Sequence, residues 1–178
     1  WYQENKRDFP WRKDQDPYHI WISEIMLQQT TTETVIPYYN RFLKNFPNVE
    51  ELASASLEEV YKMWEGLGYY RRAKHIHESA QIILEKYQGV FPYEYDAILS
   101  LKGIGEYTAG AISSIAYGKQ VPAVDGNVLR IISRYYLIKE NIAETKVQKK
   151  IYQIVQELIL NHDASAFNQG MMDLGATI

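Results

Sequence analysis

The sequence predicts an all-α protein, and three observations support that class. Apolar residues recur at helical spacing along most of the chain, strict alternation of apolar and polar residues is sustained nowhere, and capping residues precede several apolar stretches. The composition, 46% hydrophobic and 23% charged over 178 residues, is that of an ordinary globular protein. A coiled coil, a collagen-like repeat and a disordered chain are thereby excluded.

The helices predicted in the first half of the chain are joined by short connections. Asp16 is an N-cap residue and Pro17 takes the first helical position after it. A second helix is expected over Thr32 to Phe46. Ser56 begins a capping box, Ser-Leu-Glu-Glu, which predicts a third helix. A long amphipathic helix is expected over Tyr70 to Tyr87.

In the second half, predicted helices over Tyr93 to Leu99 and Glu106 to Tyr117 flank a glycine turn. Thr145 with Gln148 predicts a capping box for a later helix. The apolar face of that helix is expected to carry Ile151, Ile154, Val155 and Leu158. A last helix is expected over Ser165 to Leu174.

The net charge of −3 conceals a basic segment at residues 119–150. Seven of its residues are basic and three are acidic, which gives the segment a net charge of +4. A local basic surface can bind phosphates on an acidic protein, although a solvated helix face is the more ordinary interpretation. The sequence has no run of 18 apolar residues, so no membrane span is expected.

A Gly-x-Gly turn is the first segment that indicates more than packing. Gly103 and Gly105 make a tight hairpin with unobstructed backbone N–H groups. The following helix directs its N-terminal donors and partial positive charge outward, which suits a DNA phosphate. A plain helix-helix turn would leave the same pattern.

Two carboxylates have unusual settings. Asp125 is placed as an N-cap beside a glycine that lets a ligand approach, and a hydrogen-bonded carboxylate there stays ionised and can face a developing cation. Glu24 is one acid among apolar neighbours, so its pKa is expected to rise, as a general acid requires. Capping alone, for Asp125, and pairing with a nearby arginine, for Glu24, are the alternatives.

Six stretches together resemble one family of DNA repair proteins. The hairpin, the Gly/Pro-rich loop and the aspartate resemble the signature of the helix-hairpin-helix/GPD base-excision DNA glycosylases, and within that superfamily the chain is similar to the A/G-specific adenine DNA glycosylases of the MutY type. The matching stretches are Phe9 to Arg12, Trp21 to Thr30, Glu65 to Tyr70, Leu101 to Gly110, Val124 to Arg130 and Phe167 to Gly175.

The resemblance implies a division of catalytic roles. Glu24 would protonate the adenine and later act as the base for water, and Asp125 would stabilise the oxocarbenium-like sugar, which parallels the two-carboxylate logic of glycoside hydrolysis. Tyr107 and Asn127 would line the same pocket. The implied reaction is hydrolysis of the N-glycosidic bond of adenine mispaired with 8-oxoguanine or guanine, after base flipping.

The resemblance also implies DNA contacts. Residues expected to contact the substrate or the DNA are Arg7, Trp11, Gln29, Thr30, Leu67, Tyr69, Gly103 and Gly105. Among them, Arg7 and Trp11 would line the adenine pocket, and Gln29 and Tyr69 would be wedged into the helix beside the flipped nucleotide. The backbone carbonyls of Leu99, Leu101 and Ile104 would hold a structural cation against a phosphate.

Tyr107 discriminates within the superfamily. Bifunctional relatives that resemble endonuclease III carry a lysine two residues after the second glycine, and its amine forms a Schiff base with the sugar. Tyr107 has no amine, so a monofunctional glycosylase is expected. An endonuclease III-like glycosylase/lyase and a non-catalytic helix-hairpin-helix DNA-binding module are the alternatives.

The family architecture implies two helical lobes. A six-helix barrel with the hairpin (about 99–117) is expected over residues 18–117, and residues 1–17 and 118–178 are expected to form the second lobe. The chain starts at Trp1 and has no cysteine, so we expect a catalytic-core fragment truncated before the family's 4Fe-4S loop. Gly170 stands where a larger residue is expected. No cofactor is expected for the chemistry itself.

The expected partner is double-stranded DNA that contains A:8-oxoguanine or A:G mispairs, bound by a monomer with no membrane contact. In a bacterium the protein would be cytoplasmic and associated with the nucleoid.

Overall fold

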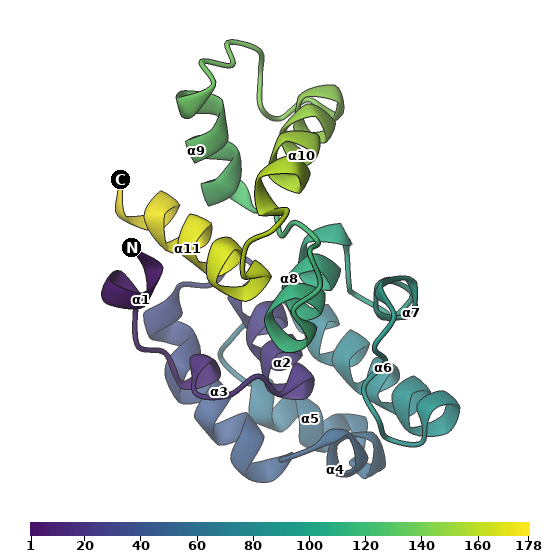
Figure 1. Cartoon of the computed structure of the whole chain (residues 1–178). Coiled ribbons are helices and arrows are strands. Elements are labelled where there is room, and N and C mark those ends of the chain that lie inside the picture. The colour runs from purple at the N-terminus through teal and green to yellow at the C-terminus, as the bar shows by residue number, and fades with distance from the viewer.

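The computed structural model covers residues 1–178 and is all-helical, as predicted (Figure 1). Its elements are α1 (Tyr2–Asn5), the 3₁₀ turn η1 (Pro10–Arg12), α2 (Pro17–Leu27), α3 (Thr32–Asn45), α4 (Val49–Ser54), α5 (Leu57–Trp64), α6 (Arg71–Tyr87), α7 (Tyr95–Leu99), α8 (Glu106–Tyr117), α9 (Gly126–Tyr135), α10 (Thr145–Ile159) and α11 (Ala164–Thr177). None of these helices combines the length and the apolar character needed to cross a membrane.

Three of the predicted helix starts are confirmed by their hydrogen bonds. The Asp16 carboxylate accepts from the backbone N–H of Tyr18 at 2.8 Å. Ser56 and Glu59 form both halves of the capping box. Asp125 caps α9. Local polar side chains therefore satisfy the first free N–H groups of these helices, as the sequence predicts.

The capping box predicted at Thr145 is wrong. Glu144 is the N-cap of α10 without a side-chain bond, Thr145 is already helical, and the Gln148 amide donates to the carbonyl of Ile142 instead. Leu158 is also exposed, and Ile159 takes the buried position. Thr145 and Gln148 have the residue types and spacing of a capping box, but the helix begins one residue too early for Thr145 to be the N-cap.

Other boundaries differ by one to three residues, and short elements were not predicted. α7 begins at Tyr95 rather than Tyr93, and α11 begins at Ala164, capped by Asp163. The missed helix α4 has Asn48 as its N-cap, which accepts from the N–H of Glu51 at 2.9 Å. α4 is only six residues long, too short for helical periodicity to show in the sequence.

Two hydrophobic clusters form the interior. The larger has 31 residues, and it includes the fully buried Trp21 and Trp64. The smaller lies between α9 and α10 and consists of Val128, Ile132, Val147, Ile151 and Val155. Phe9 and Trp11 pack into the larger cluster, although the sequence suggests that residues 1–17 join the second lobe. Trp11 meets Tyr39 of α3 edge to face, with ring centroids 5.5 Å apart.

α11 connects the two clusters. It lies between α9 and α10 on one side and α1 and α8 on the other, so that the two ends of the chain come near each other (Figure 1). The N-terminal segment, α2, α8, α9 and α11 therefore converge on one region.

Candidate active site

A cavity of about 420 Å³ lies in this region of convergence. Residues for which the sequence predicts a role line it, namely Arg7, Trp11, Glu24, Thr30, Tyr107, Asp125 and Asn127. Its apolar wall includes Phe9, Ile20, Leu27, Ile115 and Met172. The fold thus brings side chains from separate segments around one polar and partly apolar space.

Glu24 is a buried acid on a helix with almost no polar face. Eight of the eleven residues of α2 are buried, and Glu24 itself is 7% exposed. Burial raises the pKa of Glu24 to about 7; hydrogen bonding from the Tyr107 hydroxyl lowers it, the charge of Asp125 raises it further and Arg12 lowers it. Near neutral pH this carboxyl group can therefore both donate and accept a proton.

Asp125 is held more firmly than Glu24. One carboxylate oxygen accepts from the backbone N–H of Val128 at 2.8 Å, and the other accepts from the Asn127 amide at 2.9 Å. Burial raises the pKa of Asp125, and these hydrogen bonds oppose the rise. The prediction that Asp125 stays ionised took account of the hydrogen bonds but not of burial. Glu24 and Asp125 now form a pair of carboxyl groups with different restraints.

Tyr107, in the first turn of α8, stands beside both carboxyl groups. Burial and the charges of Glu24 and Asp125 raise its pKa well above the usual value, so its hydroxyl stays protonated. In this conformation the hydroxyl also points to Met172 Sδ at 3.8 Å, a weak interaction. Tyr107 is therefore a hydrogen-bond donor in the cavity and supplies no amine.

Two arginines and one aspartate form an ion cluster that the sequence reasoning missed. Asp173 of α11 is fully buried. It accepts from Arg7 Nε at 2.8 Å and from Arg12 Nη1 and Nη2 at 2.7 and 3.0 Å. Burial alone would raise the pKa of Asp173, but the hydrogen bonds and charges of both arginines outweigh burial and lower it. Asp173 lies in the stretch Phe167 to Gly175 that carries the family resemblance. That position is the one feature of the sequence that could have indicated a role for Asp173.

Gln29, Tyr69 and Leu67 lie outside the cavity. Gln29 and Tyr69 line a neighbouring hollow, together with Gln28, Tyr70 and residues of the first turns of α6. Both have positive φ angles, +58° and +48°, which is uncommon for residues with a side chain. Leu67 is buried and contributes to the larger core, so its side chain does not present a DNA-contacting surface.

The hairpin has the conformation that its two glycines predict. Gly103 has a φ of +77°, and a Cβ atom there would lie 2.8 Å from Nδ1 of His75. Gly105 is the N-cap of α8, with open space where a side chain would be. The backbone N–H groups at this end of α8 are therefore accessible to an anion.

The three hairpin carbonyls suit a hard cation. The carbonyl oxygens of Leu99 and Ile104 accept no hydrogen bond, and that of Leu101 accepts only from the N–H of Ile104 at 3.3 Å. Oxygen ligands of this kind suit hard cations. No group of three or more His, Cys, Asp or Glu side chains could hold a metal ion, and without cysteine the chain cannot ligate an iron–sulfur cluster through thiolates.

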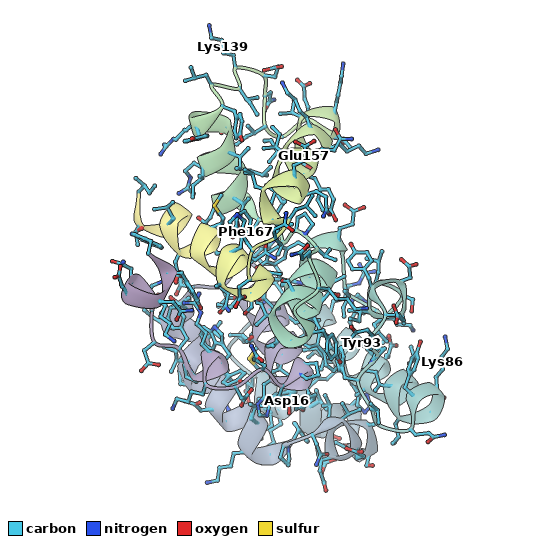
Figure 2. All side chains as sticks on the ribbon, viewed as in Figure 1. Asp16, Lys86, Tyr93, Lys139, Glu157 and Phe167 are labelled. Atoms are coloured by element: carbon cyan, nitrogen blue, oxygen red, sulfur yellow. The ribbon has the colours of Figure 1, made fainter.

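The basic segment 119–150 is less uniform than its charge suggests. Lys119 pairs with Glu94 at 3.2 Å, Lys150 pairs with Glu140 at 3.5 Å, and Arg130 donates to the carbonyl of Gly175. Lys139 projects from the α9–α10 connection at the tip of the molecule (Figure 2). The positive charges are therefore dispersed over the segment and partly neutralised.

Comparisons with known proteins bear on the family and the fold of the chain. Residues 22–157 match the model of the family described as HhH-GPD superfamily base excision DNA repair protein. The chain is 48% identical to an adenine DNA glycosylase of Buchnera aphidicola from Acyrthosiphon pisum, over 100% of this chain and 51% of the relative. It is 42% identical to the human adenine DNA glycosylase, over 100% of this chain and 34% of that protein.

Among solved structures, a thermostable thymine-DNA glycosylase is 32% identical and superposes with a TM-score of 0.89, over 99% of this chain and 82% of that one. The chain thus spans about half the length of the curated bacterial relative, and nearly the whole of it matches a solved glycosylase fold. The family match covers most of the chain. The chain belongs to the HhH-GPD superfamily of base excision DNA repair proteins.

Proposed function

We propose that this chain is the catalytic core of a monofunctional adenine DNA glycosylase. Its substrate would be double-stranded DNA with adenine opposite 8-oxoguanine or guanine. The observation that carries the proposal is the pairing in one cavity of Glu24, with a pKa near 7, and the hydrogen-bonded Asp125. The names of the relatives support adenine as the base.

Glu24 acts first, as a general acid. It gives its proton to the flipped adenine as the bond between the sugar C1′ and the base breaks, and the bonding electron pair leaves with the base. The sugar becomes an oxocarbenium ion, and the Asp125 carboxylate stabilises its positive charge. Ionised Glu24 then takes a proton from the water that attacks C1′, which regenerates the acid and leaves an abasic site.

The cavity supports a hydrolase rather than a lyase. Strand cleavage through a Schiff base needs an amine beside C1′. No lysine lines the cavity. By the family resemblance, Tyr107 stands where the bifunctional relatives carry their lysine. Lys149 lines an adjacent hollow that Asp125 also borders, which makes it the amine to test if a covalent adduct forms.

DNA binding would rest on the hairpin and on the rim of the cavity. The accessible backbone N–H groups at Gly105 would bind a phosphate, and the carbonyls of Leu99, Leu101 and Ile104 would hold a cation there. Gln29 and Tyr69 would enter the duplex beside the extruded nucleotide. Because phosphate contacts displace counterions, affinity should fall as salt rises.

The decisive experiment measures single-turnover adenine release from duplexes with adenine opposite 8-oxoguanine, guanine or thymine. We expect release opposite the first two, with an intact strand that breaks only after alkali. Glu24→Gln is the matched inactive control, because the amide keeps the shape but cannot donate the catalytic proton. Absence of adenine release under conditions where the duplex is bound would contradict the proposal and favour a DNA-binding module.

Borohydride trapping separates the remaining alternative. The chain should give little covalent adduct, since no Schiff base forms. Efficient trapping that Lys149→Met abolishes would instead establish a glycosylase/lyase that uses Lys149.

A further inference from the structure

Arg72, near the start of α6, is a buried arginine with no carboxylate partner. It is 9% exposed and takes part in no ion pair. Its Nη1 donates to the carbonyls of Ile25 at 2.9 Å, Met26 at 2.9 Å and Gln28 at 2.6 Å. These carbonyls end α2, the helix of Glu24, and the negative end of that helix offsets the positive charge of the guanidinium.

The other guanidinium nitrogen contacts a second connection. Nη2 of Arg72 lies 3.4 Å from the carbonyl of Leu67, 3.3 Å from that of Gly68 and 3.4 Å from the Thr30 hydroxyl. A planar guanidinium has donors in a fixed fork, so one side chain sets the spacing between residues 28–30 and residues 67–68.

Aromatic side chains hold the fork in its plane. The guanidinium carbon lies 5.4 Å from the ring of Trp64 and 5.5 Å from that of Tyr69. Trp64 also donates from Nε1 to the carbonyl of Gly68 at 3.0 Å, which anchors the α5–α6 connection beside Arg72.

Each of the connected segments contains a residue in the left-handed region. Gln29 lies between two residues that Arg72 contacts, and Tyr69 follows a third, Gly68. Both side chains are exposed and border the same hollow as Arg72. Non-glycine residues keep such conformations only where the surroundings enforce them. Arg72 is the group that contacts both segments.

We propose that Arg72 is a positioning residue that sets Gln29 and Tyr69 at a fixed distance from Glu24, so that base extrusion is aligned with the catalytic helix. Arg72 does not touch the substrate. This inference rests on the proposed glycosylase function. Its specific consequence is that Arg72 matters most when the adenine must still be extruded from the duplex.

The test compares Arg72→Lys with Arg41→Lys. A lysine at position 72 retains the charge and can cap the carbonyls of α2, but it lacks the fork that reaches Leu67 and Gly68. Arg41 is a matched control, because it donates to the carbonyl of Met63 at 2.9 Å and faces Tyr38 at 4.8 Å, yet is exposed and away from the cavity.

Two substrates separate positioning from general damage. One is a duplex with adenine opposite 8-oxoguanine, and the other has adenine opposite an abasic analogue, where the base is already unpaired. For Arg72→Lys, single-turnover excision should fall at least about tenfold on the paired substrate and less than about threefold on the unpaired one. Its pH midpoint and duplex affinity should stay unchanged, and Arg41→Lys should match the parent on both substrates.

Equal losses on the two substrates would mean that Arg72 only supports the fold around Glu24, and unchanged rates on both would also overturn the proposal. If Arg72→Lys does not fold, Trp64→Phe keeps an aromatic face under the guanidinium but removes the bond to Gly68. It should show the same selective loss, and a loss without substrate selectivity would contradict us.

A fluorescence measurement keeps this inference separable from the proposed function. With 2-aminopurine in place of the target adenine, unstacking is detected without any excision. The parent chain should raise the fluorescence on binding and Arg72→Lys should raise it less. If adenine release fails in the parent while this difference persists, the proposed function is wrong, and what remains is a role of Arg72 in unstacking the base. Equal fluorescence for both chains would refute the positioning role.

Discussion

Asp173 and Glu24 are both buried carboxyl groups near the same cavity, and their surroundings shift their pKa values in opposite directions. Asp173 meets two arginines at hydrogen-bonding distance, and its pKa is lowered. Glu24 has no ion-pair partner, and its pKa rises to about 7. Burial is common to both, so the positive partner decides whether a buried carboxyl stays charged or becomes a proton donor.

The difference between Asp173 and Glu24 also separates a structural role from a chemical one. Asp173 joins α11 to the N-terminal segment and stays ionised, which suits a structural link. Glu24 can exchange a proton near neutral pH, which suits chemistry but opposes stability because its charged form is poorly solvated. The two residues can be tested separately, one by stability and the other by rate.

The largest effect is expected for Glu24→Gln. Adenine release should fall about 10³- to 10⁴-fold, since no proton can be donated, while duplex affinity is retained. The folded state of the parent binds the Glu24 proton up to about pH 7. An unfolded glutamate loses its proton near pH 4.3, so stability of the parent is lost as pH rises between these values.

The glutamine variant has no such loss, so at pH 8 it should be more stable than the parent by up to about 3 kcal/mol. Urea unfolding at pH 5 and pH 8 measures this. A variant that is less stable than the parent at pH 8 would show that Glu24 is a structural group like Asp173.

Asp173→Asn should show the opposite profile, with a loss of stability of about 3 kcal/mol at pH 7, because two partly buried arginines then face each other without a counter-charge. Since the folded pKa of Asp173 is lowered, its contribution is present above the unfolded value of about 3.9 and is lost as pH falls through the folded pKa. Asp8→Asn, at an exposed site in no ion pair, is the control for urea unfolding. If Asp173→Asn were as stable as Asp8→Asn, Asp173 would not be a structural link, and its contrast with Glu24 would fail.

Asp125→Asn is expected to have an effect on the excision rate smaller than that of Glu24→Gln. Excision should fall about 10²- to 10³-fold because the cationic sugar loses its anionic partner. The thermal midpoint should change little, since asparagine is a good N-cap. Asp16→Asn provides a cap variant outside the cavity, and it should keep full activity. Retained excision with a lowered midpoint would mean that Asp125 serves only as a cap.

The smallest effect is expected for Tyr107→Phe. The hydroxyl lowers the pKa of Glu24, so its removal should raise that pKa and move the alkaline limb of the pH–rate profile upward by about half a pH unit. Single-turnover rates between pH 6 and pH 9 measure the limb. A shift to lower pH would show that the hydroxyl stabilises the protonated form instead.

Local signals explain what the sequence could predict. Asp16, Ser56 and Asp125 act on N–H groups two or three residues away, so their capping roles follow from neighbouring residues alone. The apolar setting of Glu24 is likewise visible within one helix. Thr145 shows the limit of this reasoning, because Glu144 with no side-chain bond begins α10 there.

Long-range contacts explain what the sequence could not predict. Arg12 and Asp173 are 161 residues apart, and Arg72 meets the carbonyls at the end of α2 44 to 47 residues away. Neither arginine has a distinctive local pattern, and the acceptors of Arg72 are backbone atoms that every residue has. Such partners become apparent only when the helices are packed together.

The link between Arg7 and Asp173 has a consequence for the order in which the molecule is completed. The two residues are 166 positions apart. A chain leaves the ribosome from its N-terminus, and domains begin to fold as they emerge, so the hairpin is available before residue 173. Until then Arg7 and Arg12 lack their counter-charge, and the wall of the cavity that they form is not fixed. A partly synthesised chain would therefore have its hairpin turn before the walls of the cavity are fixed, and under the proposed function only chains made at least as far as α11 would act on DNA.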